Sequence, residues 1–442
     1  MQLKLLQINA SVNTGSAGRI AEDIGKTAKA AGYESFIAYG RKSMGSDSTL
    51  IRIGNMIDLI FHLLISRLFD RHGLGSKRAT QTFIRQIEKI KPSVIHIHNI
   101  HGYYINYEIL FNYLNRLSIP VIWTFHDCWP ITGHCTFFDA VNCDKWVLKC
   151  HLCPNKKGYP KSLLFDNSKN NHAGKKALFS SCKNLIVVTP SLWLAGIVQS
   201  SFLGNKQIIT IHNGVDMQIF QPAASREVLQ KYSIPDNKFI ILGVANHWDK
   251  RKGLVDFVRL SECINNTFLI VLVGLNKHQQ KDLPANITGI SRTENIQELA
   301  QLYSISDVFV NPTRVDNFPT VNIEALACGT PVITYRTGGS PEVISEDTGF
   351  VIEKGDIAGL KQAIETVIQS GKDFYSENCR RRAVELFNKE DRYNDYITLY
   401  NSPRHFEERT TAPPSLRGTK QSRNLICTWI ASQARNDGDY DE

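Results

Sequence analysis

Short apolar runs alternate with amphipathic stretches along almost the whole chain. In the first half, apolar runs such as residues 4–10 (KLLQINA) and 121–127 (VIWTFHD) stand beside helical patterns such as residues 106–117. The second half repeats the pattern, with apolar runs at residues 238–246 (KFIILGVAN) and 268–274 (FLIVLVG). Apolar runs separated by helix-length amphipathic segments are typical of parallel strands joined by crossover helices. The pattern therefore predicts an α/β protein with two doubly wound parallel sheets.

The length of the chain supports two domains. Its 442 residues exceed the size at which a single hydrophobic core stops growing, so two domains of about 200 residues each are expected. The Asn213-Gly214 turn signal and Pro222 place the boundary between them. The predicted parts are a domain over 1–213 with a Cys-rich insertion at 128–160, a linker over 214–235, a domain over 236–375, a helix over 376–400 that returns to the first domain, and an extension over 401–442. The extension has no sustained hydrophobic period and two adjacent prolines, so we expect it to be disordered.

Charge is distributed unevenly between the two halves. Residues 1–200 carry 24 Lys and Arg against 12 Asp and Glu, whereas residues 201–442 carry 27 against 30. A basic first half indicates either an anionic partner, such as a phospholipid surface or a phosphorylated carrier, or a solvated basic face. No nucleic-acid-binding motif accompanies the charge. The N-terminus lacks the apolar core and cleavage site of a signal peptide, so we expect a cytoplasmic protein, with the cytoplasmic face of the inner membrane as a contact surface.

Residues 57–71 (IDLIFHLLISRLFDR) form the most apolar amphipathic stretch. Polar residues recur at every fourth position and form one helical stripe, and the rest of the helix surface is apolar. Two interpretations stay open: the apolar face packs inside the protein, or it docks on a membrane surface with the help of nearby basic residues. The polar stripe is Asp58, His62, Ser66 and Asp70, and the basic residues are Arg67, Arg71, Lys77 and Arg78.

The stretch 314–333 (RVDNFPTVNIEALACGTPVI) carries two carboxylates eight positions apart. Pro319 suits the first position of a helix and Gly329 the residue just past its end, so the pattern predicts a helix over 319–328 between two strands. Asp316 then lies on the loop before the helix, and Glu324 lies on the helix itself. Both lie at the carboxyl edge of a sheet, where ligands bind and helix starts attract phosphate. A ligand with phosphate and hydroxyl groups fits this edge.

Three other short motifs follow predicted strands. Gly15, Ser16 and Gly18 open a helix after the first strand, either to face a phosphate or simply to let strand meet helix. His126 ends a strand, where it either contacts a ligand or is satisfied by the backbone, and the same choice applies to three histidines in VIHIHNIH. Those three are His96, His98 and His101. Arg251, Lys252 and Gly253 precede a helix, where two cations would neutralise a diphosphate unless the loop is merely exposed.

The order of these motifs resembles the retaining GT-B glycosyltransferases of family 4. The resemblance covers roughly residues 1–400, and its most specific part runs from Asn311 to Ile344, with Gly338, Gly339 and Glu342. The resemblance implies a GT-B fold, in which two Rossmann-like domains face each other across a cleft. It further implies that the first domain binds a glycan or lipid-linked acceptor and the second binds a nucleotide sugar, of which UDP- or GDP-sugars are the main alternatives. The transferred sugar would keep its anomeric configuration.

The resemblance also assigns roles to individual residues. Glu324 would accept hydrogen bonds from the donor ribose, and Asp316 would hold the transferred sugar. The other residues assigned to the donor are Asn317, Phe318, Thr320 and Gly253. Lys252 and Arg251 would stabilise the leaving nucleoside diphosphate, and His126 would contact the sugar near its reacting carbon. Gly15, Ser16 and Gly18 would form the loop that faces the acceptor or a phosphate.

Two departures from the family pattern are visible. The first carboxylate position, which is usually Glu, holds the shorter Asp316. The arginine that is often found five or six residues before Lys-Gly is absent, because Asn246 and His247 occupy those positions. Arg251 is the substitute that the sequence offers. No Asp-x-Asp triplet lies in the part of the chain that the resemblance covers, which fits a donor site without a catalytic cofactor or metal.

Five of the ten cysteines lie between positions 128 and 153. Four of them form the spacing C-x7-C-x6-C-x2-C, which in a cytoplasmic protein favours a structural zinc site over disulfides. These four are Cys135, Cys143, Cys150 and Cys153, and His134 or His151 offers a nitrogen ligand in place of one thiolate. Free thiols and redox pairs are the alternatives.

Other functions fit parts of the sequence. Another GT-B enzyme, such as a sugar-nucleotide epimerase or a phosphorylase, shares the motifs. A zinc-stabilised nucleic-acid-binding protein would explain the cysteines and the basic charge, but it leaves Asp316 and Glu324 without a role. A dinucleotide-dependent oxidoreductase is disfavoured because no G-x-G-x-x-G motif with a following acidic residue is present. A nucleotide-sugar transferase accounts for the most motifs.

Overall fold

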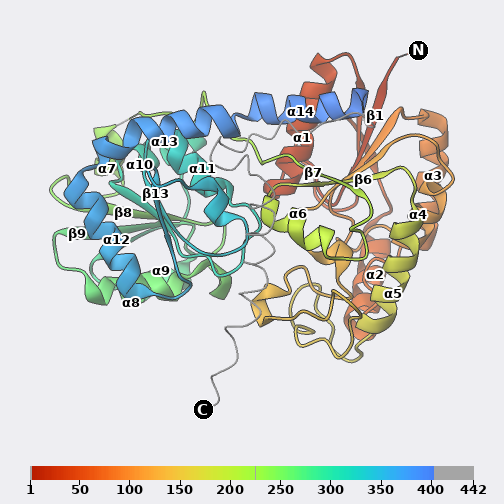
Figure 1. Cartoon of the computed structure of the whole chain (residues 1–442), viewed down its shortest axis with the longest axis horizontal. Helices are drawn as coiled ribbons and strands as arrows, with labels where there is room; N and C mark the ends of the chain where they lie inside the picture. The colour runs from red at the N-terminus through yellow and green to blue at the C-terminus, as the bar shows by residue number, and fades with distance from the viewer. Residues whose placement is uncertain (1, 224, 403–442) are drawn as a thin grey trace. The chain divides into compact units, whose positions relative to one another are not determined.

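A computed structural model describes residues 2–223 and 225–402, which contain two parallel β-sheets (Figure 1). The first sheet has the strand order β3-β2-β1-β4-β5-β6-β7 and the second the order β10-β9-β8-β11-β12-β13. The first-sheet strands are β1 (Lys4–Asn9), β2 (Glu34–Tyr39), β3 (Thr49–Arg52), β4 (Val94–Ile97), β5 (Val121–Thr124), β6 (Leu185–Thr189) and β7 (Gln207–Thr210). Those of the second sheet are β8 (Phe239–Val244), β9 (Phe268–Val273), β10 (Ile287–Ile290), β11 (Val308–Asn311), β12 (Val332–Tyr335) and β13 (Gly349–Ile352). The prediction of two doubly wound sheets is confirmed.

Helices connect the strands of both sheets. In the first half they are α1 (Gly15–Ala30), α2 (Met56–Phe69), α3 (Lys77–Ile90), α4 (Tyr107–Leu114), α5 (Ser168–Ser181) and α6 (Leu192–Gln199). In the second half they are α7 (Arg226–Lys231), α8 (Leu254–Cys263), α9 (Lys277–Lys281), α10 (Ile296–Ile305), α11 (Thr320–Ala327), α12 (Ile357–Ser370), α13 (Lys372–Phe387) and α14 (Lys389–Asn401). Short 3-10 turns are η1 (Trp129–Ile131), η2 (Asp139–Val141), η3 (Lys250–Lys252) and η4 (Ser340–Val343).

Each sheet has its own hydrophobic core. All four residues of β4 and all six of β9 are buried, as expected for strands covered by helices on both faces. The segment 214–235, predicted as a linker, packs with the second core through Val215, Met217 and Phe220. Val215 also forms an isolated parallel bridge with Asn388, so this segment contacts both the second core and the residue between α13 and α14.

Helix α11 follows the prediction closely but starts one residue later than expected. Pro319 is the N-cap, with an extended backbone, and Thr320 is the first helical residue. Because Pro319 lies outside the helix, its missing N–H costs no intrahelical hydrogen bond. Gly329 has a φ of +73° just after the C-cap Cys328, which is the left-handed conformation that ends many helices.

The C-terminal part of the described chain forms two helices where the sequence predicted one over 376–400. Asn388 separates α13 from α14 with a ψ of 124° and caps α14 with its side chain. Helix α14 packs against α1, and its Tyr400 bonds His96 of the first sheet at 2.6 Å (Figure 1). The predicted extension began at Asn401, which instead ends α14, and residues 403–442 lie outside the described residues.

Helix α2 has its polar stripe inside and its apolar face outside. His62 is fully buried, and its ring bonds Ser76 at 2.9 Å and accepts from the Gly73 N–H at 3.0 Å. In contrast, Ile57 is 77% exposed and Phe61 is 60% exposed. The interpretation that the apolar face packs inside the protein is therefore wrong for the described residues, because the buried polar groups satisfy one another on the inner side. No helix in residues 2–223 and 225–402 is long and apolar enough to span a membrane.

Candidate active site

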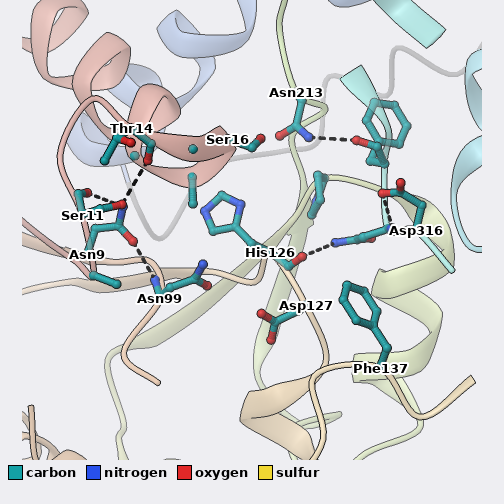
Figure 2. Close-up of a pocket in the computed structure, with 17 residues that line it drawn as sticks. Asn9, Ser11, Thr14, Ser16, Asn99, His126, Asp127, Phe137, Asn213 and Asp316 are labelled. Atoms are coloured by element: carbon teal, nitrogen blue, oxygen red, sulfur yellow. Dashed lines mark hydrogen bonds between the residues drawn. The ribbon is translucent and has the colours of Figure 1, made fainter. Parts of the chain in front are cut away.

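The main pocket is lined by residues from both halves of the chain (Figure 2). It has a volume of about 350 Å³ and takes its walls from the loops that follow β1, β5 and β11. These loops all leave the carboxyl ends of parallel strands, which is where open α/β sheets bind ligands. Of the predicted residues, the pocket walls include Gly15, Ser16, Gly18, His126, Asp316, Asn317 and Phe318.

The glycine motif forms the start of α1. Thr14 is the N-cap, but its side chain makes no capping hydrogen bond, so the first N–H groups of the helix have no partner from it. Ser16 and Gly18 line the pocket directly (Figure 2). The positive end of the α1 dipole is thus available to an anionic or hydroxyl-bearing ligand.

His126 is held by a buried hydrogen-bond chain. The Gln7 side-chain amide donates to the Ala21 carbonyl, so its oxygen accepts from His98 Nε2 at 3.0 Å. His98 Nδ1 is then the acceptor for His126 Nε2 at 3.1 Å. This assignment, made from the hydrogen-bond network, leaves His126 Nδ1 as a free acceptor nitrogen on a side chain that lines the pocket. Burial lowers the pKa of His126 to about 4, so the ring is neutral at physiological pH.

The predicted cations converge on Asp316. Lys252 Nζ forms an ion pair with the Asp316 carboxylate at 2.5 Å, and an Arg251 guanidinium nitrogen lies 4.0 Å from the same oxygen. Arg251 also donates to the Val315 carbonyl at 2.9 Å. Glycine at position 253 lets the loop that carries these cations lie against the loop after β11. Its φ is +78°, and a Cβ there would lie 2.2 Å from the Pro312 carbonyl oxygen. The fold therefore places two cations against the Asp316 carboxylate.

Glu324 lies on α11, away from the lining of the main pocket. Its carboxylate accepts a hydrogen bond from the Tyr303 hydroxyl at 3.0 Å, and burial raises its pKa above the ordinary value. Thr320 lies one turn earlier on the same helix, and Arg19 of α1 lowers the pKa of Glu324 electrostatically. Five predicted donor-site residues do not line the pocket themselves, although each lies close to the pocket-lining Asp316 in the sequence or belongs to the loop that contacts it. They are Glu324, Thr320, Arg251, Lys252 and Gly253.

Direct contacts join the two halves beside the pocket. Ser191 Oγ donates to the Asn317 side-chain oxygen at 2.8 Å, and the Asn317 amide donates to the His126 carbonyl at 3.3 Å. The Glu342 carboxylate accepts from the N–H groups of Leu192 and Trp193, each at 2.7 Å. Glu342 of η4 thereby caps the start of α6 from the other half of the chain.

Several pocket residues were not identified from the sequence. Asn9 and Asn99 follow β1 and β4, and the Asn99 N–H donates to the Asn9 side chain at 3.2 Å. Asp127, next to His126, bonds His101 at 2.9 Å. The sequence signal that could have identified Asn9, Asn99 and Asp127 is their position at or just after the end of a strand. Phe137 comes from the Cys-rich insertion, and nothing in its sequence context indicated that it would reach the pocket.

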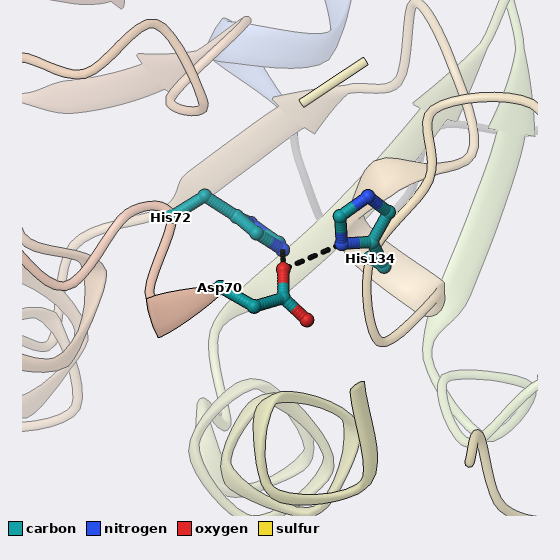
Figure 3. Close-up of side chains that lie close together, drawn as sticks. All are labelled: Asp70, His72 and His134. Atoms are coloured by element: carbon teal, nitrogen blue, oxygen red, sulfur yellow. Dashed lines mark hydrogen bonds and ion pairs between the residues drawn. The ribbon is translucent and has the colours of Figure 1, made fainter. Parts of the chain in front are cut away.

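The Cys-rich insertion encloses a second, much smaller cavity of about 10 Å³. Its lining includes Cys135, Cys143, Cys150, Cys153, His134 and His151. The donor atoms of another group, Asp70, His72 and His134, all lie within 4.8 Å of one another (Figure 3). Among the described residues the four cysteines do not form such a tight group, so the predicted four-thiolate site stays a prediction.

Comparisons with known proteins agree with the fold and the motif order. The family described as Glycosyltransferase Family 4 matches residues 17–219, and Glycosyl transferases group 1 matches residues 225–385. A putative colanic acid biosynthesis glycosyl transferase, WcaC of Escherichia coli, is 24% identical over 421 residues, which is 90% of this chain and 100% of the relative.

Two solved structures have similar folds. Sucrose-phosphate synthase from Thermosynechococcus elongatus has a TM-score of 0.69 at 18% identity, covering 91% of this chain and 99% of its own. Anabaena HepE, solved in complex with UDP, has a TM-score of 0.63 at 15% identity, covering 90% of this chain and 100% of its own.

Proposed function

We propose that this chain, which belongs to the family 4 glycosyltransferases and has their GT-B fold, transfers a sugar from a UDP- or GDP-sugar to a glycan or lipid-linked acceptor. The observation that carries the proposal is the pocket shared by the α1 start and His126 of one half and Asp316 to Phe318 of the other. A reaction between two substrates needs both held in one place at reacting distance. The similarity to a relative named for colanic acid biosynthesis supports a role in cell-surface polysaccharide synthesis.

The donor would bind at the second half. Lys252 and Arg251 would hold the diphosphate, and Glu324 would accept from the ribose. In the described structure Lys252 is paired with Asp316. A bound diphosphate would take over Lys252, which frees the Asp316 carboxylate to accept from a hydroxyl of the transferred sugar. The α1 start and the neutral His126 would face the sugar and the acceptor.

Transfer would proceed with retention of configuration. The bond between the anomeric carbon and the phosphate oxygen breaks, and the acceptor oxygen attacks from the same face. The acceptor proton passes to the departing phosphate oxygen, so no separate base is needed. Lys252 and Arg251 would stabilise the charge that builds on the leaving diphosphate, the effect expected of fixed cations in a closed site.

A nucleotide-binding experiment tests the donor part of this proposal. The melting temperature of the protein would be measured with UDP, GDP, ADP and dTDP at equal concentrations. UDP or GDP should raise it, because a ligand present at 100 times its dissociation constant adds about 2.7 kcal/mol of stability. The Glu324→Gln variant should show a smaller rise. If none of the four diphosphates stabilised the wild-type protein, the assignment of a nucleotide-sugar site would fail.

A membrane surface is the second part of the proposal. The exposed apolar face of α2 continues into the segment 163–165, because the Leu163 N–H bonds the Arg67 carbonyl at 2.7 Å and Phe165 stacks on Phe69 at 5.6 Å. Basic side chains surround it, and those of Arg71, Lys77 and Arg78 are exposed. An exposed apolar surface with basic residues nearby in the sequence matches a lipid bilayer that contains anionic headgroups. Such contact would place the active site beside a lipid-linked acceptor at the cytoplasmic face of the inner membrane.

Vesicle co-sedimentation tests the membrane contact. The wild-type protein should sediment with phosphatidylglycerol-containing vesicles and much less with pure phosphatidylcholine. The double variant Ile57→Ser with Phe61→Ser should lose binding, whereas Phe374→Ser, at a 66% exposed position on α13, should keep it. Equal binding by all variants, or an apolar face covered by a second copy in sedimentation analysis, would contradict the proposal.

A further inference from the structure

The small cavity in the Cys-rich insertion has an unsatisfied buried nitrogen in its wall. His134 is 1% exposed, and its Nε2 is among the buried side-chain atoms without a hydrogen-bond partner. His134 lines the cavity together with four cysteines. A buried polar atom without a partner costs free energy, so such an atom calls for a ligand.

The other nitrogen of His134 is fixed. His134 Nδ1 donates to Asp70 at 2.5 Å, and the second Asp70 oxygen accepts from the Asn167 N–H at 2.8 Å (Figure 3). His72, the third member of this group, accepts from the Trp129 indole at 2.7 Å. Asp70 and His72 are therefore occupied by hydrogen bonds. A histidine that donates one N–H to a carboxylate presents its other nitrogen as a lone pair, which is the usual arrangement around a metal-bound imidazole.

One thiol on the cavity wall has a hydrogen bond of the kind that is common around metal thiolates. The Gly133 N–H donates to Cys150 Sγ at 3.2 Å. N–H groups directed at sulfur stabilise negative charge on it, as do second-shell donors at metal sites.

A buried lysine contacts the wall of the cavity. Lys175 is fully buried, donates to the carbonyls of Trp129 and Thr132 at 2.7 and 3.0 Å, and forms no ion pair among the described residues. It lies 3.4 Å above the Trp129 ring centre. Three thiolates on one divalent ion carry a net charge of −1, which would stabilise an ammonium group at this buried position.

We propose that this cavity is a structural zinc site of the Cys3His type, with His134 Nε2 as its nitrogen ligand and Asp70 as the residue that orients it. The three thiolate ligands are Cys135, Cys150 and Cys153. Among the described residues no three of the four proposed donor atoms lie within 4.8 Å of one another, so the thiol side chains would rotate towards His134 Nε2 when the ion binds. The cavity has about the volume that one water molecule requires, which suits a single ion. Cys150 and Cys153 form the Cys-x2-Cys pair and Cys135 adjoins His134 in the sequence, so Cys143 is left outside the ligand set.

The site would connect to the active-site pocket through the insertion. Phe137, two residues after Cys135, lines that pocket, and the Arg251 guanidinium lies 5.7 Å from its ring centre. An ion that ties the insertion together would therefore fix a wall of the pocket without contacting either substrate. Its role is to position residues rather than to take part in transfer.

Metal analysis of the full-length protein, purified without chelators, tests the site. We expect about one zinc per chain by elemental analysis, and X-ray absorption should show three sulfur neighbours and one nitrogen. Cys153→Ser and His134→Ala should lose the zinc, whereas Cys143→Ser and Cys263→Ser should retain it. Asp70→Asn should weaken zinc affinity about 10-fold to 100-fold in competition with a chromogenic chelator.

A substitution that keeps a metal-ligating atom at position 134 distinguishes the loss of a zinc ligand from a general folding defect. His134→Cys should retain one zinc per chain, with four sulfur neighbours in place of three. Zinc loss in Cys143→Ser with retention in His134→Ala would overturn the assignment of His134 in favour of four thiolates. A wild-type protein that contains no zinc and takes up neither zinc nor cobalt from solution would overturn the site altogether.

Discussion

Lys252 is paired with Asp316 at 2.5 Å, which joins the loop before α8 to the loop before α11. The two residues come from different βα units, 64 positions apart, and both belong to the carboxyl edge of the second sheet. The pair keeps a cation and a carboxylate close to the pocket until an anionic ligand competes for the cation.

Replacing Lys252 with Ala should lower turnover. The loss of one fixed cation near a departing diphosphate typically costs about 2 to 4 kcal/mol in a closed site, which corresponds to about a 30-fold to 1,000-fold lower kcat. Steady-state kinetics with the cognate donor would measure the change. Lys250→Ala is the matched control, because Lys250 lies in the same η3 turn, is exposed and has no ion pair in the described structure. Equal losses in the two variants would point to a general effect of charge.

Replacing Glu324 with Gln should weaken nucleotide binding more than it changes folding. A hydrogen bond to a charged group is worth about 1.5 to 3 kcal/mol, so the dissociation constant of the nucleoside diphosphate should rise about 10-fold to 150-fold. Isothermal titration calorimetry would measure it. Glu385→Gln, on the exposed surface of α13, is the control. Unchanged affinity in Glu324→Gln would remove the ribose assignment.

The chain from Gln7 through His98 to His126 should matter for turnover rather than for nucleotide affinity. His98→Phe removes the acceptor that fixes the His126 tautomer, so Nδ1 would no longer be held as a lone pair. We expect kcat to fall about 5-fold to 150-fold, the range for losing about 1 to 3 kcal/mol of a buried interaction. The nucleotide affinity of His98→Phe should stay within about 2-fold of the wild-type affinity, because the histidine chain and the nucleotide site share no residue. A change in affinity without a change in kcat would contradict this role.

Stability should decrease as the pH falls from about 7 towards 4. Burial lowers the pKa of seven histidines below the ordinary 6.5, and they are His62, His72, His96, His98, His126, His172 and His212. In this window the unfolded chain takes up protons on these rings and the folded chain does not, so acid favours unfolding. Each ring contributes at most about 1.4 kcal/mol per pH unit.

Carboxylates oppose this trend in part. Burial raises the pKa of Glu342 to about 7 and that of Asp139 to about 6, and it also raises the pKa values of Asp23, Asp307 and Glu324. The folded chain holds protons on these groups at pH values where the unfolded chain has released them. Those protons stabilise the folded state as the pH falls, and each such group offsets one histidine. Urea unfolding at pH 7, 6 and 5 would measure the sum. A free energy of unfolding that stayed level or increased towards pH 5 would show that the histidines are not buried as described.

The sheets and the site edge could be predicted because their signals are local. Continuous apolar runs mark buried parallel strands, and residues just after such runs must lie at the carboxyl edge. This rule placed His126 and Asp316 each at the carboxyl edge of its own sheet, and both residues line the same pocket. The ends of α11 were predictable to within one residue for the same reason, since Pro319 and Gly329 act through their own backbone.

Features that depend on distant partners could not be predicted. The inversion of α2 requires Ser76 and the Gly73 N–H to meet His62, and hydropathy alone does not reveal which face finds polar partners. The position of Phe137 in the pocket wall depends on the fold of the Cys-rich insertion, which no local sequence pattern specifies. The sequence left His134 and His151 as equal alternatives for a nitrogen ligand, and the choice of His134 Nε2 depends on Asp70, 64 positions away, which bonds the other nitrogen of the ring.

The most direct test of the central claim is sugar transfer chemistry itself. The purified protein would be incubated with UDP-, GDP-, ADP- and dTDP-sugars, with and without a membrane extract as the source of acceptor, and release of nucleoside diphosphate would be measured. Release from a UDP- or GDP-sugar by the wild-type protein, abolished or strongly reduced in Glu324→Gln and Lys252→Ala, is the predicted result. Release that both variants carried out at the wild-type rate would contradict the assignment of the donor site at Lys252, Asp316 and Glu324.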